Sequence, residues 1–246
     1  MDYSLENSFE VQEKIREKKV AILPIGAVEA HGPHLPLGTD NILAERLADK
    51  IASEVDAFVL PLLPYGQVWS LKNFPGSLTI SNQTLIQLVT DLGKSLYEQG
   101  FKVFVLLSAH LGNITALKEA ARHLYESTPG LTVLSFFYPG TTEVMNQVRE
   151  GEKVHHTYIH ACEIETSIML YLAEEFVDMS KAIKDLPDIP PDADVTPTPW
   201  ERFTRTAVLG DATLATREKG EKIVTLAIKN SVRLIEHAKK RDRTTQ

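Results

Sequence analysis

The sequence predicts an α/β fold: a single domain in which a mostly parallel β-sheet is flanked by helices on both faces. Short β-branched apolar runs alternate with longer segments of helical periodicity through the first half of the chain. This alternation is typical of βαβ units, whose right-handed crossovers place helices on both faces of a parallel sheet. The 246 residues, of which 43% are hydrophobic, are enough for one sizeable core. We therefore expect residues 1–246 to form one domain.

Four apolar runs are predicted as strands, at residues 20–25, 58–63, 103–107 and 132–137. Helical periodicity predicts helices at residues 9–18, 41–55, 83–98, 114–126, 164–175 and 218–237. The second half is less regular and contains a Pro-rich acidic excursion at residues 185–200. A segment of this length is either an ordered lid or subunit contact, or a disordered loop, and the sequence leaves both open.

The charge of the chain excludes several classes of partner. With a net charge of −7 and a pI near 5.6, it offers no basic stripe to displace counterions from nucleic acid. The basic stretch at residues 239–243 is interpreted as the solvated end of a helix. A single cysteine excludes an intrachain disulfide framework, the N-terminus is acidic where a signal peptide would be basic, and no apolar run approaches the roughly 18 residues that span a bilayer. We expect a cytoplasmic protein without a nucleic-acid or membrane partner.

Candidate metal ligands cluster just after the first predicted strand. Glu29, His31, His34 and Asp40 fall within a dozen residues. Glu29 and His31 are two apart on extended chain, so they point to the same side, with attachment points roughly 7 Å apart. Carboxylate and imidazole together suit Zn²⁺, Mn²⁺ or Fe²⁺. Such side chains could bind one ion, or neighbouring ions of a pair about 3.5–4 Å apart.

A further candidate ligand, His110, follows the third predicted strand. Ligands of open α/β sheets lie outside the carboxyl ends of the strands, so Glu29, His31 and His110 should meet at one rim. Asp40 opens the next predicted helix, directly after Thr39. As the N-cap of that helix, Asp40 would have a structural role instead.

Five motifs, in this order along the chain, resemble those of the creatininase (creatinine amidohydrolase) family. The similarity covers residues 20–220. The first motif is the most specific, because a dozen residues are fixed in type and spacing. The motifs are residues 29–40, residues 74–77, the turn at His110, the segment that begins at His160, and residues 210–213.

The resemblance implies an α/β fold with two divalent metal ions per chain (Zn, Mn or Fe) and metal-activated water that hydrolyses an amide. We accordingly expect an amidohydrolase that cleaves a non-peptide or cyclic C–N bond of a small polar substrate. The resemblance also implies a homo-oligomer, with a hexamer as the expected form. The family includes formamide hydrolases of pterin-type and deazaflavin biosynthesis and an enzyme that trims a peptide precursor of a redox cofactor. The resemblance therefore names no single substrate.

By the resemblance, Glu29, Asp40 and His110 hold one ion, while His31 and the bridging Asp40 hold the other. Creatininase has one more ligand to the second ion, a Glu two residues after the His that matches His110. This chain has Gly112 at that place. The second ion therefore needs a ligand from elsewhere.

Members that resemble this chain carry Glu at the place of Glu163, so Glu163 is the predicted replacement, with Glu165 as its rival. His160 and Glu163 are three apart and share a face if the turn there is helical. His160 is the predicted general acid for the leaving nitrogen, oriented by Glu163 or Glu165 if these do not bind metal. As a cap of the following helix, His160 would be structural instead. His34 is expected to fix the loop or a ligating carboxylate from behind.

Two other functions remain open on the sequence. A formamide deformylase acting on a nucleotide-derived pyrimidine would need Arg, Lys or a helix N-terminus near the rim to bind phosphate. A non-catalytic metal-binding assembly protein is favoured by Gly112 and opposed by the other ligands that the chain retains. His155 and His156 are predicted as surface residues. A dinucleotide-binding domain is excluded, because no Gly-x-Gly-x-x-Gly follows the first strand.

Overall fold

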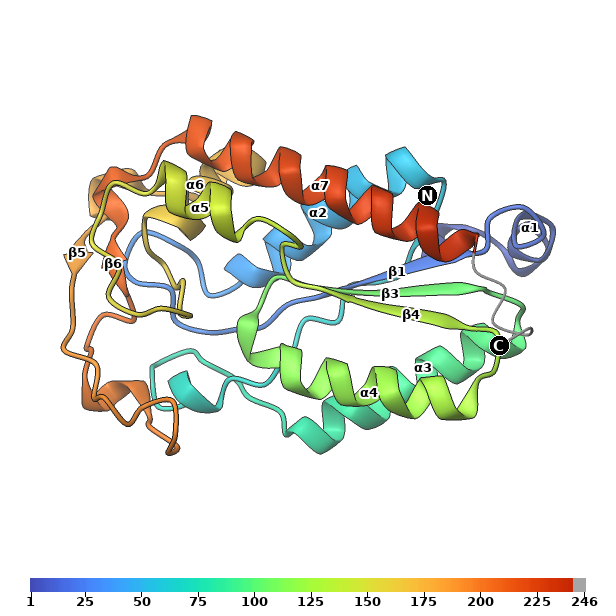
Figure 1. The fold of residues 1–246 in the computed structure, drawn as a ribbon, viewed down its shortest axis with the longest axis horizontal. Helices are drawn as coiled ribbons and strands as arrows, with labels where there is room; N and C mark the ends of the chain where they lie inside the picture. The colour runs from blue at the N-terminus through green and yellow to red at the C-terminus, as the bar shows by residue number, and fades with distance from the viewer. Residues whose placement is uncertain (241–246) are drawn as a thin grey trace.

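Strand β1 (Val20–Ile25) lies inside the sheet, and all six of its residues are buried. In the computed structural model, which describes residues 1–240, β1 pairs in parallel with β2 (Phe58–Val59) and with β3 (Val103–Ser108). Strand β4 (Thr132–Phe136) pairs in parallel with β3, which gives the order β2-β1-β3-β4 (Figure 1). An apolar run covered on both faces is what a central parallel strand requires. The predicted parallel sheet is confirmed.

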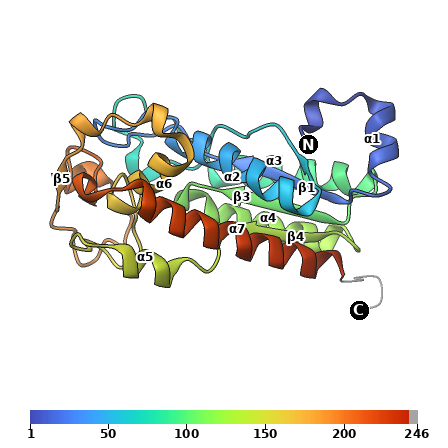
Figure 2. The same ribbon diagram turned by 90° about the horizontal axis from the view of Figure 1, so that it is seen from above.

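Helices cover both faces of this sheet, as the expected fold class requires (Figures 1 and 2). Helices α2 (Thr39–Val55), α6 (Glu163–Ala173) and α7 (Arg217–Lys239) pack together over one face. Helices α3 (Asn82–Glu98) and α4 (Ile114–Ser127) cover the other. The rest of the basic stretch that follows α7, residues 241–243, lies outside the described residues.

The alternation of side chains along β3 divides the core into two halves. Val103 and Val105 belong to the cluster under α2, α6 and α7, whereas Phe104 and Leu106 belong to the cluster under α3 and α4. Successive side chains of a strand point to opposite faces, so a wholly apolar run serves both clusters.

Two predicted elements differ clearly from the observed ones, and one observed α-helix was not predicted. The strand predicted at 58–63 ends at Val59, because Pro61 lacks an N–H for the ladder, and the chain rejoins β1 only through a bridge between Ile25 and Leu63. Helix α1 (Ser8–Lys14) is shorter than predicted. Helix α5 (Thr142–Val148) was not predicted, since seven residues carry too little periodicity.

The Pro-rich excursion links two short strands, β5 (Lys184–Asp185) and β6 (Gly210–Asp211), which pair antiparallel. Its far end is anchored by Trp200, which is buried in a small cluster with Leu209 and Val68. Figure 1 shows it at the end of the molecule where the loops after the parallel strands gather. Its position beside those loops brings it to the predicted ligands.

Short 3₁₀ helices occupy the remaining connections. They lie at Tyr3–Leu5, Trp69–Leu71, Leu111–Asn113, Glu174–Phe176, Met179–Lys181, Trp200–Arg202 and Ala212–Leu214. Within residues 1–240, none of the helices combines the length and the apolar character that crossing a bilayer requires.

Candidate metal centre

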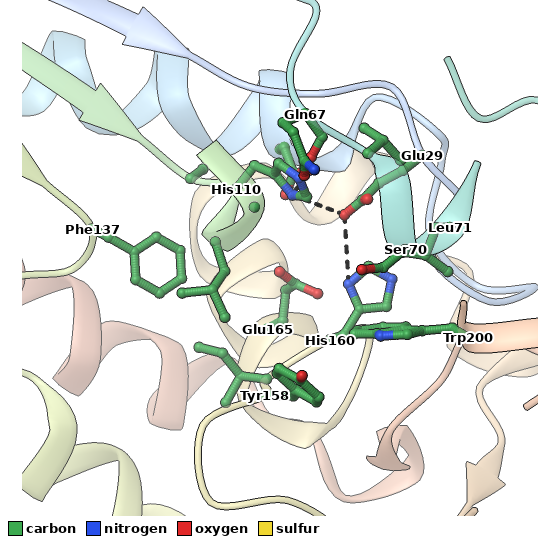
Figure 3. A pocket seen from close by; sticks show the side chains of 16 residues that line it. Glu29, Gln67, Ser70, Leu71, His110, Phe137, Tyr158, His160, Glu165 and Trp200 are labelled. Carbon is green, nitrogen blue, oxygen red and sulfur yellow. Dashed lines mark hydrogen bonds and ion pairs between the residues drawn. The ribbon is translucent and has the colours of Figure 1, made fainter. Parts of the chain in front are cut away.

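Buried acidic and histidine side chains meet beyond the carboxyl ends of β1 and β3 (Figure 3). They come from the loop after β1, the first turn of α2, the loop after β3, and the start of α6. The residues predicted after the first and third strands do lie together, as parallel strands require. The set consists of Glu29, His31, Asp40, His110, His160 and Glu165.

Within this set, Glu29, Asp40 and His110 form a first group. The Nδ1 of His110 lies 3.0 Å from Oε1 of Glu29 and 3.3 Å from Oδ2 of Asp40. All three side chains are at least nine-tenths buried. Two carboxylates and one imidazole nitrogen around a single point are a donor set that Zn²⁺, Mn²⁺ and Fe²⁺ accept.

A second group consists of His31, Asp40 and Glu165. The Nε2 of His31 lies 3.6 Å from Oδ1 of Asp40 and 3.5 Å from Oε2 of Glu165. Asp40 thus faces the two groups with different oxygens. The alternative role of Asp40 is wrong: the N-cap of α2 is Gly38, and no side chain caps this helix.

Backbone carbonyls orient both imidazoles for ligation. The Nε2 of His110 donates to the carbonyl of Gln67 at 2.7 Å, and the Nδ1 of His31 donates to the carbonyl of Glu29 at 3.1 Å. A carbonyl oxygen only accepts, so each of these nitrogens carries a hydrogen. The opposite nitrogen of each neutral ring then directs its lone pair into the cluster, as in metal-binding histidines.

Several buried polar atoms of the cluster have no hydrogen-bond partner among residues 1–240. Burying these atoms without hydrogen bonds is costly, even beside the imidazoles, and a divalent ion would satisfy them together. The residues present therefore fit the metal centre that the motifs imply. The atoms are both carboxylate oxygens of Glu29, Nε2 of His31 and Oδ2 of Asp40.

The pKa values reflect the mutual compensation of these charges. Burial alone would lower the pKa of His31, but the carboxylates of Asp40 and Glu165 outweigh it and raise the pKa to about 10. The pKa of His110 is also raised, because Glu29 and Asp40 outweigh its burial. Burial raises the pKa of Glu165 to about 7. Without metal, protons on the imidazoles balance the carboxylates.

The structure does not bring Glu163 to this cluster, contrary to its predicted place as a ligand. Its carboxylate accepts a hydrogen bond from Lys219 Nζ at 2.5 Å and from the backbone N–H groups of Glu150 and Gly151. Residues two apart on a helix lie about 200° apart around its axis, so Glu163 and Glu165 face different surroundings. Glu165 occupies the place that was predicted for Glu163.

The spacing argument that paired His160 with Glu163 fails for a local reason. Helix α6 begins only at Glu163, and Ala161 has a left-handed backbone with φ of 47°. His160 and Glu163 therefore do not share a helical face. The alternative that His160 caps the helix is also wrong, because the N-cap residue is Cys162.

His160 instead lies against the cluster. Its Nε2 donates to the carbonyl of Ala30 at 2.8 Å, and its Nδ1 lies 3.6 Å from Oε1 of Glu29. Its ring packs against those of His31 and Trp200, with centroids 4.3 and 5.1 Å away. Burial and the neighbouring His31 lower the pKa of His160 to about 4. The ring is therefore neutral, with a free lone pair on Nδ1.

His34 lies behind the cluster, as expected. Its Nε2 shares a hydrogen bond of 2.9 Å with the hydroxyl of Thr166, the residue after Glu165. This contact ties the loop after β1 to the start of α6. Within residues 1–240, His34 forms no hydrogen bond or ion pair with a carboxylate of the cluster, so it supports the loop rather than a ligand's oxygen.

Gly112 has a steric role that the sequence did not reveal. A Cβ at this position would lie 2.4 Å from Nε2 of His110 and 2.5 Å from the carbonyl oxygen of Gln67. These are the two atoms of the hydrogen bond that orients His110. The chain therefore has no room for a glutamate side chain at position 112. The glutamate that reaches the cluster is Glu165, from the first turn of α6.

The cluster opens into a cavity of ≈ 150 Å³. Three of its lining residues, Gln67, Tyr158 and Trp200, were not identified from the sequence. Gln67 acts through its backbone carbonyl, which no sequence pattern marks. The sequence indicates Trp200 only weakly, because this residue ends the Pro-rich excursion for which a lid is one interpretation.

His155 and His156 lie outside this cavity and approach the Oδ2 of Asp194 at 3.2 and 3.3 Å. The Nδ1 of His155 accepts hydrogen bonds from the backbone N–H groups of Thr157 and Tyr158. The proton of the neutral His155 ring is therefore on Nε2, where it faces Asp194. This arrangement favours a hydrogen-bonded contact over metal ligation.

Comparisons with known proteins agree with this site. A model of the creatininase family, described as creatinine amidohydrolase, matches residues 5–235. A creatinine amidohydrolase of Pseudomonas putida is 30% identical over 222 residues, which are 85% of each chain. A mycofactocin precursor peptide peptidase of Mycolicibacterium smegmatis is 27% identical over 214 residues, covering 83% of this chain and 79% of the relative.

A solved mutant creatininase of the Zn-Zn type is similar in structure, with a TM-score of 0.83 and 27% sequence identity over 96% of this chain and 97% of the other. Sequence and fold thus agree over nearly the whole chain. This chain belongs to the creatininase (creatinine amidohydrolase) family of hydrolases.

Proposed function

We propose that this chain is a dinuclear metal-dependent amidohydrolase that cleaves a non-peptide or cyclic C–N amide bond of a small polar substrate. The observation that carries the proposal is the pair of three-residue groups that share Asp40 through different carboxylate oxygens. Glu29, Asp40 and His110 would hold one ion, and His31, Asp40 and Glu165 the other. Both groups are buried, so each ion would be shielded from bulk water except through the cavity.

When bound, a pair of divalent ions supplies a water that loses its proton near neutral pH and a Lewis acid for the amide carbonyl. The chain must still move a proton to the leaving nitrogen, which is too basic to depart without one. His160 is placed for this task. Its Nε2–H is held by the carbonyl of Ala30, so Nδ1 takes the proton of the attacking water and passes it to the leaving nitrogen.

The cavity wall opposite the ligands is apolar. Val68, Leu71, Phe137 and Trp200 line it, and no Lys or Arg does. Apolar walls exclude competing water and strengthen the electrostatic interactions of the reacting groups. The volume and the lack of a cation favour a small uncharged reactive end of the substrate.

The relative from Mycolicibacterium smegmatis is described as a peptidase of a precursor peptide. A peptide amide is therefore an alternative bond for this site, and it belongs in any substrate panel. A non-catalytic metal-binding assembly protein is less well supported, because the ligand cluster borders a cavity lined by His160 and Trp200.

We also propose that the chain is cytoplasmic and forms a homo-oligomer, with a hexamer as the expected form. The cytoplasmic location is favoured by the lone Cys162, which is buried and has no disulfide partner. The homo-oligomer is inferred from the resemblance to the creatininase family.

The function is tested by assaying metal-loaded protein against creatinine, other cyclic amides, N-formyl amines and short peptides. We expect turnover of at least one non-peptide amide. His160→Gln should lower kcat by about 10²–10⁴-fold with metal content unchanged, because the proton transfer is lost. His123→Gln, on the exposed face of α4, is the matched control. Turnover of peptides alone, or full activity of His160→Gln, would contradict the proposal.

A further inference from the structure

A second cavity of ≈ 290 Å³ adjoins the catalytic one. The two cavities share Leu111, Phe137 and Ile159 in their linings, so these side chains lie between them. Figure 3 shows Phe137 on the side of the catalytic cavity remote from Trp200. The second cavity is formed by the turn after β4, by α5 and by the segment at residues 149–157.

The second cavity is cationic although the whole chain carries a net charge of −7. Arg149, Lys153 and His156 line it, and no Asp or Glu does. Within residues 1–240, neither Arg149 nor Lys153 forms an ion pair, whereas His156 approaches Asp194. Two cations without a counter-ion at one cavity are unusual in an acidic protein, since carboxylates are in excess.

One buried donor at this cavity also has no partner among the described residues. It is the Nε of Arg149. This Nε is buried although Arg149 as a whole is partly exposed. A buried donor without an acceptor is costly, so an acceptor group at this place would stabilise it.

Cavity size gives an independent reason to connect the two spaces. Small-molecule sites usually have volumes of about 300–1,000 Å³. The catalytic cavity, at ≈ 150 Å³, holds the reactive end of a substrate but little more. A larger substrate must extend past Phe137 and Ile159 into the second cavity.

We propose that the second cavity binds an anionic group, a carboxylate or a phosphate, at the distal end of the amide substrate. Arg149 offers a planar fork of donors that matches either anion, and Lys153 adds a second positive charge. The substrate class is then an amide with an acidic tail, and this assignment rests on the proposed amidohydrolase function.

Matched substrates separate the tail from the reactive amide. The probes are ω-formamido carboxylates with two to five methylene groups, the corresponding ω-formamidoalkyl phosphates, and the uncharged methyl amides of the acids. For at least one length, we expect kcat/KM of an anionic probe to exceed that of its uncharged counterpart at least tenfold. The better of the two anionic series identifies the tail.

Arg149→Gln should remove this preference through KM, leaving kcat/KM for the uncharged probes within twofold. Arg149→Lys should retain part of the preference, because it keeps the charge but loses the fork. Arg122→Gln, on the exposed face of α4, is the control. Equal kcat/KM for charged and uncharged probes, or a preference that persists in Arg149→Gln, would overturn the proposal.

A binding measurement distinguishes failure of this proposal from failure of the proposed function. Calorimetric titration of metal-loaded protein with inorganic phosphate and with acetate needs no turnover. We expect the dissociation constant of one anion to rise at least tenfold in Arg149→Gln and to stay unchanged in Arg122→Gln. Such binding without amide turnover would sustain the anion site and reject the amidohydrolase. Amide turnover without Arg149-dependent anion binding would sustain the amidohydrolase and reject the anion site.

Discussion

At the scale of single residues, two glutamates two positions apart have different tasks. Glu165 faces His31 and Asp40, whereas Glu163 pairs with Lys219. We expect Glu165→Gln to retain about one ion per chain and to lose activity by orders of magnitude, because a catalytic ion usually needs three protein ligands. Elemental analysis of the dialysed variant measures this directly.

Glu163→Gln is the internal comparison for Glu165→Gln. It should keep both ions but cost about 1–3 kcal/mol of unfolding free energy, since the buried Lys219 loses one of its two carboxylate partners and keeps only the exposed Glu150. Denaturant unfolding measures that loss. If Glu163→Gln lost an ion while Glu165→Gln kept both, the assignment of the two residues would have to be exchanged.

Four of the cluster's residues could be predicted from the sequence because they directly follow strands or open a helix. Glu29, His31, Asp40 and His110 are in such places, and parallel strands bring their carboxyl ends to one rim. The choice between Glu163 and Glu165 could not be predicted. It depends on which residue begins α6, and the left-handed Ala161 that fixes this start has no sequence signal, since it is not a glycine.

At the scale of elements, the loop after β3 is shaped by the absence of a side chain at Gly112. Gly112→Ala places a Cβ against His110 and Gln67, whose hydrogen bond orients the imidazole. We expect a loss of about 1–3 kcal/mol of unfolding free energy, as for other overpacked sites, together with weaker binding of the ion held by His110. Thermal unfolding with and without metal measures both effects.

Gly38→Ser is the matched control for Gly112→Ala, because a Cβ at Gly38 meets nothing within 4 Å and serine is well accepted at the N-cap of α2. Equal stability and metal content in the two variants would contradict the steric role of Gly112.

The long elements could be predicted closely, and the short ones could not. Helix α3 and strand β1 carry many periodic apolar residues, so their bounds agree with the prediction to within one residue. Strand β2 and helix α5 are too short for periodicity to define them. The antiparallel pair of β5 and β6 depends on contacts between residues far apart in sequence, which local patterns do not encode.

At the scale of the whole molecule, metal binding should be coupled to protons. The pKa of about 10 at His31 and the raised pKa of His110 mean that both rings are protonated at neutral pH without metal. Ligation needs the inward nitrogen of each ring bare and Glu165, whose pKa is raised to about 7, ionised. Loading at neutral pH should therefore release about two to three protons per chain, and affinity should weaken as the pH falls. Titration of metal into metal-stripped protein in weakly buffered solution counts the protons. Loading without proton release would show that the rings are already neutral.

The assembly state is the second property of the whole molecule that can be tested. We expect a homo-oligomer, as a hexamer, in solution. Light scattering after size-exclusion chromatography gives the mass, which should be about six times the 27.4 kDa of one chain. A monomer at micromolar concentration would remove this expectation, whereas another closed oligomer would correct only its size.

The most direct test of the shared metal centre is the metal content of Asp40→Asn beside that of the wild-type chain. After loading and gentle dialysis, we expect two divalent ions per wild-type chain. We expect near-complete loss of both in Asp40→Asn, because Asp40 faces both groups of ligands. Asp49→Asn, on the exposed face of the same helix, should keep both ions. A wild-type chain that holds one ion or none, or an Asp40→Asn chain that still holds two, would rule out a metal centre shared through Asp40.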